Sequence, residues 1–377
     1  MLLIGIALIV VSFSLEIWTL IPAPTNVLWQ VALGTGEWGL WFSLASFIGL
    51  FIVWRAHALD ARPIFRFALM AMGIDALGMG LVPLYSASKV GSLSLREYVL
   101  GVPLEKVRQT TEVFAHVGDQ DLKVDIYSRA ADSATQSHPA IIVIHGGSFR
   151  AGERSDFRRW DEWLANQGAT VFDIDYRIAP QPNFPHAVAD VKCAIGWVRK
   201  NATAHGVDPN RIALYGRSAG ANLALLAAYS AGDTRLPASC EVSDTSVAKV
   251  ISLYGSTDLP FGYAHVVNPA AHDGQDVLRT YLGGTPASVP DAYALASPIT
   301  HADDAHSPPT LLFHGGHDQL ISHLQMDRLQ KALPTRARSI YLPYAQHGFD
   351  YNENGWGSQI VRTEVQRFLG DFLPPTR

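Results

Sequence analysis

Lysine and arginine are absent from the first 54 residues of the 377-residue chain, where only Glu16 and Glu37 carry charge. The whole chain has a net charge of −5 and therefore lacks the excess of basic residues that nucleic-acid binding usually requires. Only two cysteines are present, Cys193 and Cys240, which excludes a disulfide-rich scaffold and a cysteine-based metal cluster. The two thiols could pair, but neither spacing nor context indicates a bond, so two separate buried thiols are expected.

Residues 1–90 contain few charged residues and three long apolar runs. Residues 2–21, LLIGIALIVVSFSLEIWTLI, are long enough to span a bilayer core, and they lack the basic start of a cleaved signal peptide. Residues 38–54 have a tryptophan at each end, as interfacial anchors would, and Asp75 and several glycines interrupt the third run, residues 67–85. The segment is interpreted as a membrane anchor of about three transmembrane helices. The alternative is a buried helical subdomain of a soluble protein.

The loop after the second run contains Arg55, Arg62 and Arg66, the only basic cluster near the apolar runs. Because basic loops stay in the cytoplasm, this loop is expected there. Three crossings then place the N-terminus inside and everything after Tyr85 on the extracytoplasmic side. If the third run does not span, the large domain that follows is cytoplasmic instead.

From about residue 100, short β-type runs alternate with helical patterns. The runs TEVFAHV and LKVDIYS, with a turn between them, predict a hairpin. Most of the later runs are continuously apolar, as in strands buried on both faces: AIIVIHG, TVFDIDY, RIALYG, KVISLYG, TLLFHGG and SIYLPY. The alternation predicts an α/β domain over residues 100–377, with a mainly parallel sheet and helices on both faces. Residues 256–307 show no clear periodicity between two strands and are interpreted as a lid-like excursion.

The stretch LYGRSAGAN places Gly216, Ser218 and Gly220 in a G-x-S-x-G pattern, directly after an apolar strand and at the start of a helix. In that context the serine lies on a tight strand-to-helix turn with its hydroxyl exposed. The N-terminus of the helix behind it favours developing negative charge. Ser218 is therefore the predicted nucleophile.

A serine nucleophile needs a base, and the base needs an acid that orients it. In α/β-hydrolases the chain order is Ser, then Asp or Glu, then His. Asp318 follows a strand 100 positions beyond Ser218, and His347 follows the next strand 29 positions further on. Asp258 also follows a strand and is the rival acid. His314 and His317 could form a metal site with His347, but no third ligand at a recognised metal spacing accompanies them.

The stretch IIVIHGGSFR ends a buried strand in His145, Gly146 and Gly147. In serine esterases a glycine loop of this kind, with the N–H of the residue after the nucleophile, binds the oxyanion. Gly146, Gly147 and Ala219 are therefore the predicted oxyanion hole, because a side chain on either glycine would fill the space of the substrate oxygen. His145 is expected to brace the loop, and Ser148 to be an ordinary loop residue near the pocket.

Several separated motifs together resemble the α/β-hydrolase esterases: HGGSF, DIDYRIAPQPNFPHAVADVKCAIGWVRKNA, GVDPNRIALYGRSAGANLA, YLGGTPASVPDAYALASPITH, PPTLLFHGGHDQLIS and HGFD. The similarity spans about residues 105–375. Within that fold the chain resembles the bacterial feruloyl and acetylxylan esterases (BD-FAE), near the hormone-sensitive-lipase-like carboxylesterases. The resemblance implies a carboxylic ester hydrolase with a triad and oxyanion hole formed by Ser218, Asp318, His347, Gly146, Gly147 and Ala219.

The chain departs from the resemblance at two places. Arg217 stands where hormone-sensitive-lipase-like enzymes usually carry aspartate, and the apolar segment 1–90 is absent from the usual secreted or cytosolic members.

The predicted protein is thus a membrane-anchored carboxylesterase-type serine hydrolase that acts on a small-molecule or lipid-like ester through an acyl-enzyme, with no metal or cofactor. The same triad also serves a formamidase, a peptidase or an acyltransferase, and the pockets rather than the triad distinguish these. A catalytically inactive, membrane-tethered binding module is a further alternative. It would be indicated by loss of a triad member, and all three are present.

Overall fold

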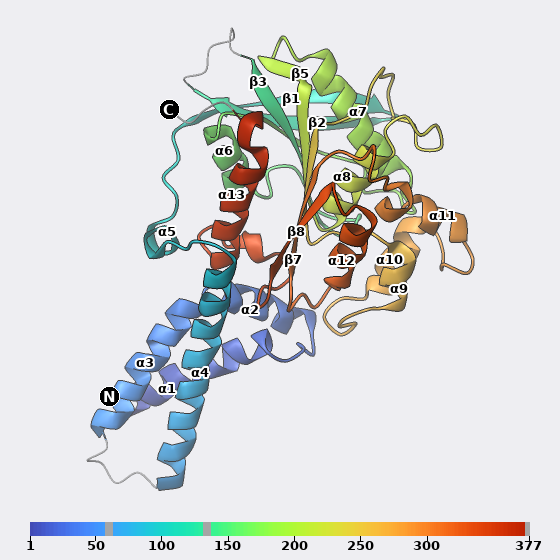
Figure 1. The fold of residues 1–377 in the computed structure, drawn as a ribbon. Coiled ribbons are helices and arrows are strands. Elements are labelled where there is room, and N and C mark those ends of the chain that lie inside the picture. Colours follow the sequence, from blue (N-terminus) through green and yellow to red (C-terminus); the bar gives the residue numbers. More distant parts are fainter. Residues whose placement is uncertain (57–62, 131–136, 374–377) are drawn as a thin grey trace.

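The computed structural model describes residues 1–56, 63–130 and 137–373. Figure 1 shows two parts, an α/β body formed by the chain after about residue 100 and a bundle of long helices that projects from it. The body contains the predicted catalytic residues, and the bundle is formed by the apolar N-terminal segment.

The body is built on one eight-stranded sheet in the order β1-β2-β4-β3-β5-β6-β7-β8. The strands are β1 (Val107–Val117), β2 (Gln120–Arg129), β3 (His138–Ile144), β4 (Thr170–Ile174), β5 (Val207–Arg217), β6 (Lys249–Leu253), β7 (Thr310–Gly315) and β8 (Ala337–Leu342). β1 and β2 form the predicted antiparallel hairpin, β2 pairs antiparallel with β4, and the remaining neighbours are parallel. The predicted α/β fold with a mainly parallel sheet is confirmed.

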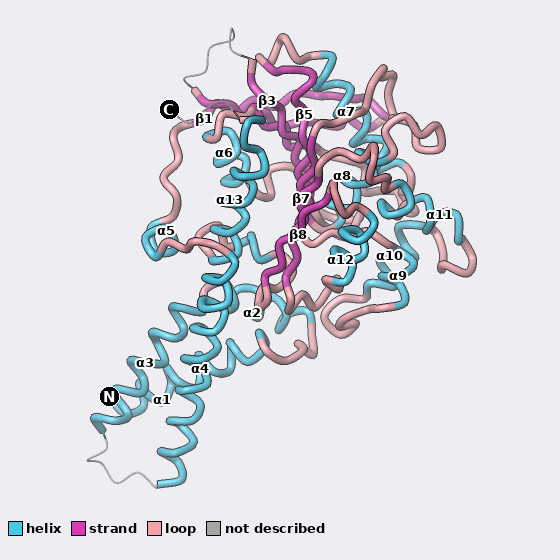
Figure 2. The backbone as a smooth tube through the Cα atoms, viewed as in Figure 1, coloured by secondary structure: helices cyan, strands magenta, loops and turns pink. Residues whose placement is uncertain are grey.

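Helices cover both faces of the sheet. Those that pack on it are α6 (Arg158–Asn166), α7 (His186–Lys200), α8 (Ala219–Tyr229), α12 (Leu324–Ala332) and α13 (Trp356–Leu369). The structure also contains α5 (Leu95–Leu100), α9 (Leu259–Ala264), α10 (Gly274–Leu282) and α11 (Pro290–Leu295). Successive side chains of a strand point to opposite faces, so Ile142 and Ile144 of β3 pack in one core with α7, α8 and α12. Ile141 and Val143 pack in the other core with α6 and α13. Figure 2 shows α6 and α13 on one side of the strands and α7, α8 and α12 on the other.

Residues 256–307, where the sequence predicts no regular element, contain the short helices α9, α10 and α11. The Asp258 side chain accepts the Phe261 N–H at 3.0 Å, and the Asp273 side chain accepts the Asp276 N–H at 2.9 Å. These are N-caps of α9 and α10. Helices of six to nine residues are too short for their periodicity to stand out from the sequence.

Among the described residues, the bundle consists of α1 (Leu2–Glu16), α2 (Asn26–Glu37), α3 (Gly39–Arg55) and α4 (Pro63–Val90). Two stretches, Leu2–Thr19 and Leu69–Val90, are long and apolar enough to cross a membrane. α2 and α3 meet at an angle of 83° and together could supply a third crossing. The predicted run 38–54 coincides with α3, whereas α2 has no counterpart among the predicted elements.

The basic cluster that predicts the orientation lies at the connection between α3 and α4. Arg55 ends α3 and Arg66 belongs to the first turns of α4, while residues 57–62, which include Arg62, lie outside the described residues. In Figure 1 the end of α3, the start of α4 and the N-terminus all lie at the end of the bundle that is far from the body.

Cys193 and Cys240 form a disulfide, so the expectation of two separate thiols is wrong. Their Cα atoms are 5.4 Å apart, within the usual range for a bridge. Lys192, the neighbour of Cys193 on α7, donates to the carbonyl oxygens of Ser230 and Leu236 at 2.6 and 2.7 Å. These bonds hold the segment between α8 and β6 against α7. The pairing depends on this packing, which the spacing of the cysteines does not reveal.

Candidate active site

Ser218 lies on the turn between β5 and α8, at the carboxyl edge of the sheet. Its backbone has φ 53° and ψ −118°, a conformation that a residue with a side chain adopts only where its surroundings impose it. The flanking glycines permit the turn, because a Cβ on Gly216 would overlap the carbonyl oxygen of Gly220, and one on Gly220 would overlap that of Ile144. The Ser218 N–H donates to the Leu253 carbonyl oxygen at 3.0 Å. The G-x-S-x-G pattern therefore forms a tight turn.

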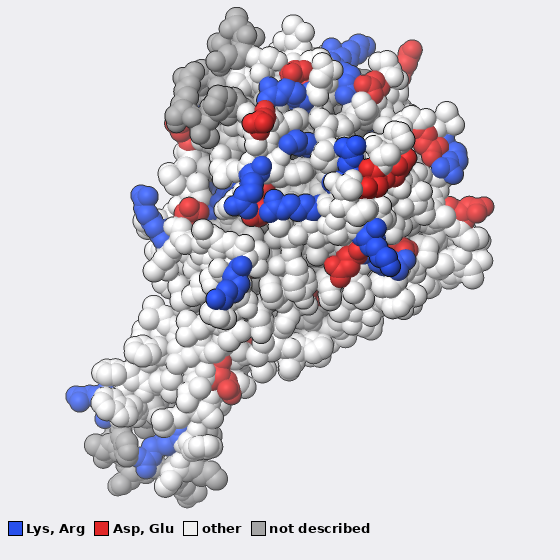
Figure 3. All heavy atoms as spheres, in the orientation of Figure 1, with Lys and Arg blue, Asp and Glu red and all other residues white. Residues whose placement is uncertain are grey.

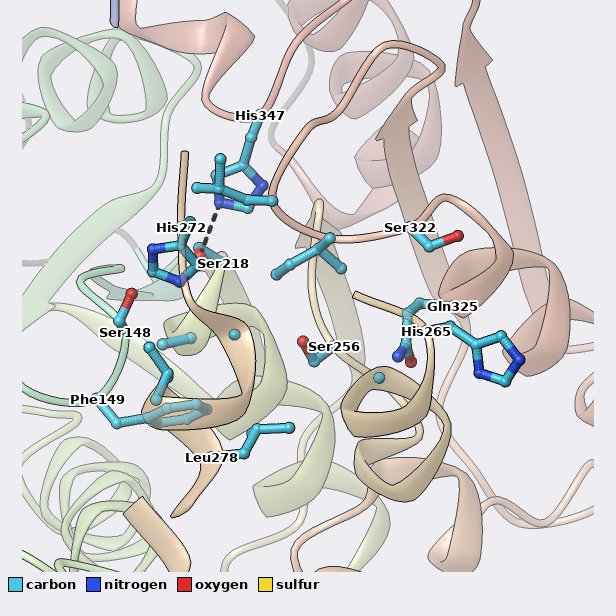
Figure 4. Close-up of a pocket in the computed structure, with 16 residues that line it drawn as sticks. Ser148, Phe149, Ser218, Ser256, His265, His272, Leu278, Ser322, Gln325 and His347 are labelled. Atoms are coloured by element: carbon cyan, nitrogen blue, oxygen red, sulfur yellow. Dashed lines mark hydrogen bonds between the residues drawn. The ribbon is translucent and has the colours of Figure 1, made fainter. Parts of the chain in front are cut away.

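His347 lies between Ser218 and Asp318. Its Nε2 is 2.9 Å from Oγ of Ser218, a contact drawn as a dashed line in Figure 4, and its Nδ1 is 2.8 Å from Oδ2 of Asp318. An ionised carboxylate only accepts hydrogen bonds, so Nδ1 carries the proton and Nε2 accepts the serine hydroxyl. The three residues follow β5, β7 and β8, whose carboxyl ends lie at one edge of the sheet, and the structure brings them together there.

The Asp318 carboxylate is buried and held by several donors. Its Oδ1 accepts the backbone N–H groups of Leu320 and Ile321 at 2.8 and 2.9 Å, and Oδ2 lies 3.1 Å from Nε2 of His314. Burial alone would raise the pKa of Asp318, but the charge of His347 and the hydrogen bonds from His314 and His347 keep that pKa well below its usual range. The carboxylate therefore stays ionised and orients the imidazole.

The residues that the sequence offered as alternatives, Asp258 as the acid and His314 and His317 as metal ligands, have other partners. Asp258 caps α9, and its Oδ2 is 2.5 Å from the Arg328 guanidinium. His314 also approaches the carbonyl oxygen of Ile321 at 2.9 Å, while His317 Nδ1 is 2.7 Å from the carbonyl oxygen of Thr19. Within the described ranges, no group of three or more His, Cys, Asp or Glu side chains could hold a metal ion.

The glycine loop after β3 lies directly beside the elbow. A Cβ on Gly146 would be 3.3 Å from Cβ of Ser218, which places this loop against the serine. In the part of the chain that the structure describes, no loop or turn hydrogen bond uses the N–H of Gly146, Gly147 or Ala219. These three N–H groups are available to a ligand oxygen.

Gly147 is also required by the conformation of the loop itself. Gly147 has φ 114°, and its Cβ would overlap the carbonyl oxygen of Ala151, so a side chain there would collide with the loop itself. His145 braces the same loop, because its ring stacks on Tyr176 at a centroid distance of 4.3 Å and its Nδ1 approaches the Gly146 carbonyl oxygen at 2.7 Å. Ser148 lines the neighbouring cavity.

Arg217, the residue that departs from the resemblance, is buried behind the serine. Its Nε lies 2.6 Å from Oδ2 of Asp350, and Tyr254 donates its hydroxyl to Oδ1 of the same carboxylate at 2.5 Å. The guanidinium also lies over the Phe157 ring at 4.0 Å from the centroid. An ion pair thus links the turn that carries Ser218 to the segment just after His347.

Two cavities meet at Ser218 and His347. We name the first the lid-side cavity. Its largely apolar wall includes Phe149, Val277, Leu278, Leu320 and Ile321. The second, the helix-side cavity, is lined by Gly146, Gly147, Phe157, Tyr254, Tyr351 and Trp29. Residues 256–307 thus contribute to the first cavity, and the N-terminal helices contribute to the second.

Two residues of these walls, His272 and Trp29, have no recognisable signal in the sequence. His272 lines both cavities, and Figure 4 places it beside Ser218 and His347. Burial, together with the charge of His347, lowers the pKa of His272. Trp29 belongs to α2, within the segment that composition assigns to the membrane. His272 lies in a stretch without periodicity, and Trp29 lies far from every motif, so only the fold connects them to the serine.

The chain was compared with known proteins. The BD-FAE family model matches residues 124–333. Esterase LipC of Mycobacterium tuberculosis is 34% identical over 240 residues, which cover 62% of this chain and 58% of LipC. Esterase LipQ of the same organism is 28% identical over 295 residues, which cover 76% of this chain and 67% of LipQ. The aligned region thus spans about three fifths to two thirds of the length of these relatives.

A solved structure, Thermogutta terrifontis esterase 2 phosphonylated by sarin, is similar with a TM-score of 0.61 and 26% identity, covering 74% of this chain and 99% of that one. The family match extends from β2 to the end of α12 and includes the serine elbow and Asp318. It covers more than half of the chain, and the sheet order and elbow agree with it. The chain therefore belongs to the BD-FAE family and has the α/β-hydrolase fold.

Proposed function

We propose that this protein is a membrane-anchored serine hydrolase of carboxylic esters. The observation that carries the proposal is the hydrogen-bonded series from Asp318 through His347 to Ser218 at the junction of two cavities. The names of the relatives LipC and LipQ, both esterases, support it. The substrate is a small-molecule or lipid-like ester.

The reaction proceeds by acyl transfer in two steps. Nε2 of His347 takes the hydroxyl proton as Oγ of Ser218 attacks the ester carbonyl carbon, and the Asp318 carboxylate stabilises the imidazolium. The tetrahedral intermediate collapses when His347 gives its proton to the leaving alcohol. Water then attacks the acyl-enzyme with His347 again as base, which releases the acid and restores the serine.

The oxyanion of each tetrahedral intermediate receives hydrogen bonds from the N–H groups of Gly146, Gly147 and Ala219. Each preorganised donor of this kind is worth roughly 3 to 4 kcal/mol of transition-state stabilisation. Ala219 opens α8, so the helix N-terminus adds a favourable dipole at the same point.

A fluorophosphonate probe tests the proposal directly, because such probes modify activated serines. The Thermogutta esterase carries the same kind of adduct. We expect labelling of Ser218, with loss of p-nitrophenyl acetate hydrolysis in parallel. Hydrolysis that persists in fully labelled protein would contradict the assignment of Ser218. A folded protein that neither labels nor hydrolyses the ester would contradict an esterase function altogether.

Residues 1–90 are proposed to be a multi-pass membrane anchor, with the catalytic domain of residues 100–377 on the extracytoplasmic side. Two stretches long and apolar enough to cross support this proposal. Small residues let the bundle helices approach closely, since a Cβ on Gly49 of α3 would lie 2.8 Å from the carbonyl oxygen of Gly5 of α1. The Cys193–Cys240 disulfide supports the location, because such bonds persist in oxidising compartments.

Removing this disulfide should destabilise the domain. Replacing both cysteines by serine is expected to lower the free energy of unfolding by about 4 kcal/mol, because the bond closes a loop of 47 residues in the unfolded chain. Denaturant unfolding of the double variant and of wild type measures the difference. Maleimide labelling of protein isolated from cells should detect both thiols only after reduction. Labelling without reduction would contradict both the bond and the proposed location.

A further inference from the structure

The connection between α1 and α2 packs on the loop that carries Asp318. His317 Nδ1 donates to the carbonyl oxygen of Thr19 at 2.7 Å. The Gln319 side chain accepts the backbone N–H of Ala23 at 2.8 Å. His317 and Gln319 are the two neighbours of Asp318 in the chain, so the acid is held between two bonds to the N-terminal segment.

The same connection is bonded to the loop that carries His272. Asn268 donates to the carbonyl oxygen of Ala23 at 2.8 Å, and Asn26 donates to the carbonyl oxygen of Ala271 at 2.9 Å. Ala271 precedes His272 directly. Two loops of the active-site rim are therefore fixed to the start of α2.

α2 then contributes to the wall of the helix-side cavity. Its last residue, Glu37, accepts a hydrogen bond from Asn352 at its carbonyl oxygen (3.1 Å), which holds this end on the segment after His347. Trp29, in the first half of α2, lines the cavity together with Gly146 and Ser218. Figure 1 shows α2 between the long helices and the ends of β7 and β8.

Trp29 belongs to an aromatic wall of the helix-side cavity, and its indole N–H is a hydrogen-bond donor without a partner among the described residues. Its Nε1 is buried. Phe157, Tyr254 and Tyr351 form other parts of the same wall. A buried donor without a partner is costly, and the oxygen atom of a ligand that reached Nε1 would satisfy it.

The outer surface beside this cavity is apolar. Leu20 and Ile21, on the connection, are 46% and 44% exposed, Val27 of α2 is 67% exposed, and Val267 of the neighbouring loop is 44% exposed. In Figure 3 the charged side chains gather on the body, and few lie over the helices or their junction with it. An apolar surface next to membrane-crossing helices is suited to the lipid interface.

We propose that residues 17–37 are a built-in cap of the active site and that Trp29 within it selects an amphiphilic ester with a long apolar chain, drawn from the adjacent lipid. This inference rests on the proposed ester hydrolase function. The apolar chain occupies the helix-side cavity against the aromatic wall. The indole N–H of Trp29 donates to a substrate oxygen close to the scissile bond. The chemistry is unchanged: water is consumed, and an acid and an alcohol are released.

The test compares two esters on the full chain reconstituted in phosphatidylcholine vesicles. Trp29→Ala should lower kcat/KM for p-nitrophenyl laurate by roughly tenfold to a hundredfold, as loss of an aromatic contact and a hydrogen bond implies. Hydrolysis of p-nitrophenyl acetate, which cannot fill the cavity, should change by less than about threefold. Trp29→Phe keeps the apolar contact without the donor and should give an intermediate loss for the laurate ester only.

Trp54→Ala is the matched control, because Trp54 is an exposed tryptophan of α3 that lines neither cavity. It should leave both rates unchanged. Equal losses for the two esters in both Trp29 variants, or an unchanged laurate rate, would overturn the role of Trp29 while leaving the esterase function standing. If wild type hydrolyses neither ester and does not react with a fluorophosphonate, the proposed function itself fails, and the two failures are thereby distinguished.

Discussion

Replacing Ser218 with alanine should lower kcat for p-nitrophenyl acetate by roughly 10⁴- to 10⁶-fold. The hydroxyl oxygen Oγ is the atom that would bond to the acyl group, and it lies 2.9 Å from Nε2 of His347. Without it the remaining N–H groups and cavities can still bind the ester, so a small residual rate above the uncatalysed one is expected. Initial rates of purified variant and wild type measure the effect.

The fold should survive this substitution, because it removes a single oxygen atom. Circular dichroism and the unfolding midpoint of Ser218→Ala should match those of wild type. Ser246→Ala is the control, since Ser246 is an exposed serine in the segment before β6 and should keep full activity. A Ser218→Ala enzyme with the wild-type rate would require a different nucleophile.

Replacing Arg217 with methionine should lower the free energy of unfolding by about 3 to 5 kcal/mol, because it leaves the Asp350 carboxylate buried without its cation. Arg217 is 1% exposed and Asp350 is 0% exposed, so water cannot replace the lost partner. Tyr254 would remain as a donor to Asp350, but a neutral hydroxyl does not balance the charge. Denaturant unfolding in detergent measures the change.

A double variant distinguishes the contribution of the ion pair to the free energy of unfolding from the cost of leaving one buried charge without a partner. Arg217→Met combined with Asp350→Leu should recover a large part of the stability that either single variant loses, because both charges are then gone. The exposed pair Arg158–Glu162 on α6 is the control, and its loss should cost at most about 1 kcal/mol. Single variants as stable as wild type would contradict the ion pair.

The sequence was informative wherever local patterns determine structure. Continuous apolar runs predicted strands β3 to β7, since a strand buried on both faces needs apolar residues on both. The glycines around Ser218 predicted a tight turn, because only small residues fit at Gly216 and Gly220. Asp318 and His347 were identifiable because each follows a strand, and the carboxyl ends of parallel strands converge.

The sequence was uninformative where contacts between distant parts of the chain determine the structure. The sequence predicts no element over residues 26–37, so it indicates neither α2 nor the place of Trp29 in a cavity wall beside Ser218. The disulfide depends on how the segment before β6 lies on α7. The requirement for Gly147 comes from its left-handed backbone and the nearby Ala151, neither of which a short motif specifies.

The bonds between the α1–α2 connection and the loops that carry Asp318 and His272 couple the N-terminal helices to the α/β body. A domain joined to its anchor by a flexible linker can exchange that anchor for another with little consequence. In this protein, replacing the N-terminal helices would remove the hydrogen-bond partners of His317, Gln319 and Asn268, whose side chains now bond to backbone groups of the α1–α2 connection. The N-terminal helices and the body are therefore constrained to change together, because a chain without these helices would leave two loops beside Ser218 without the bonds that now hold them.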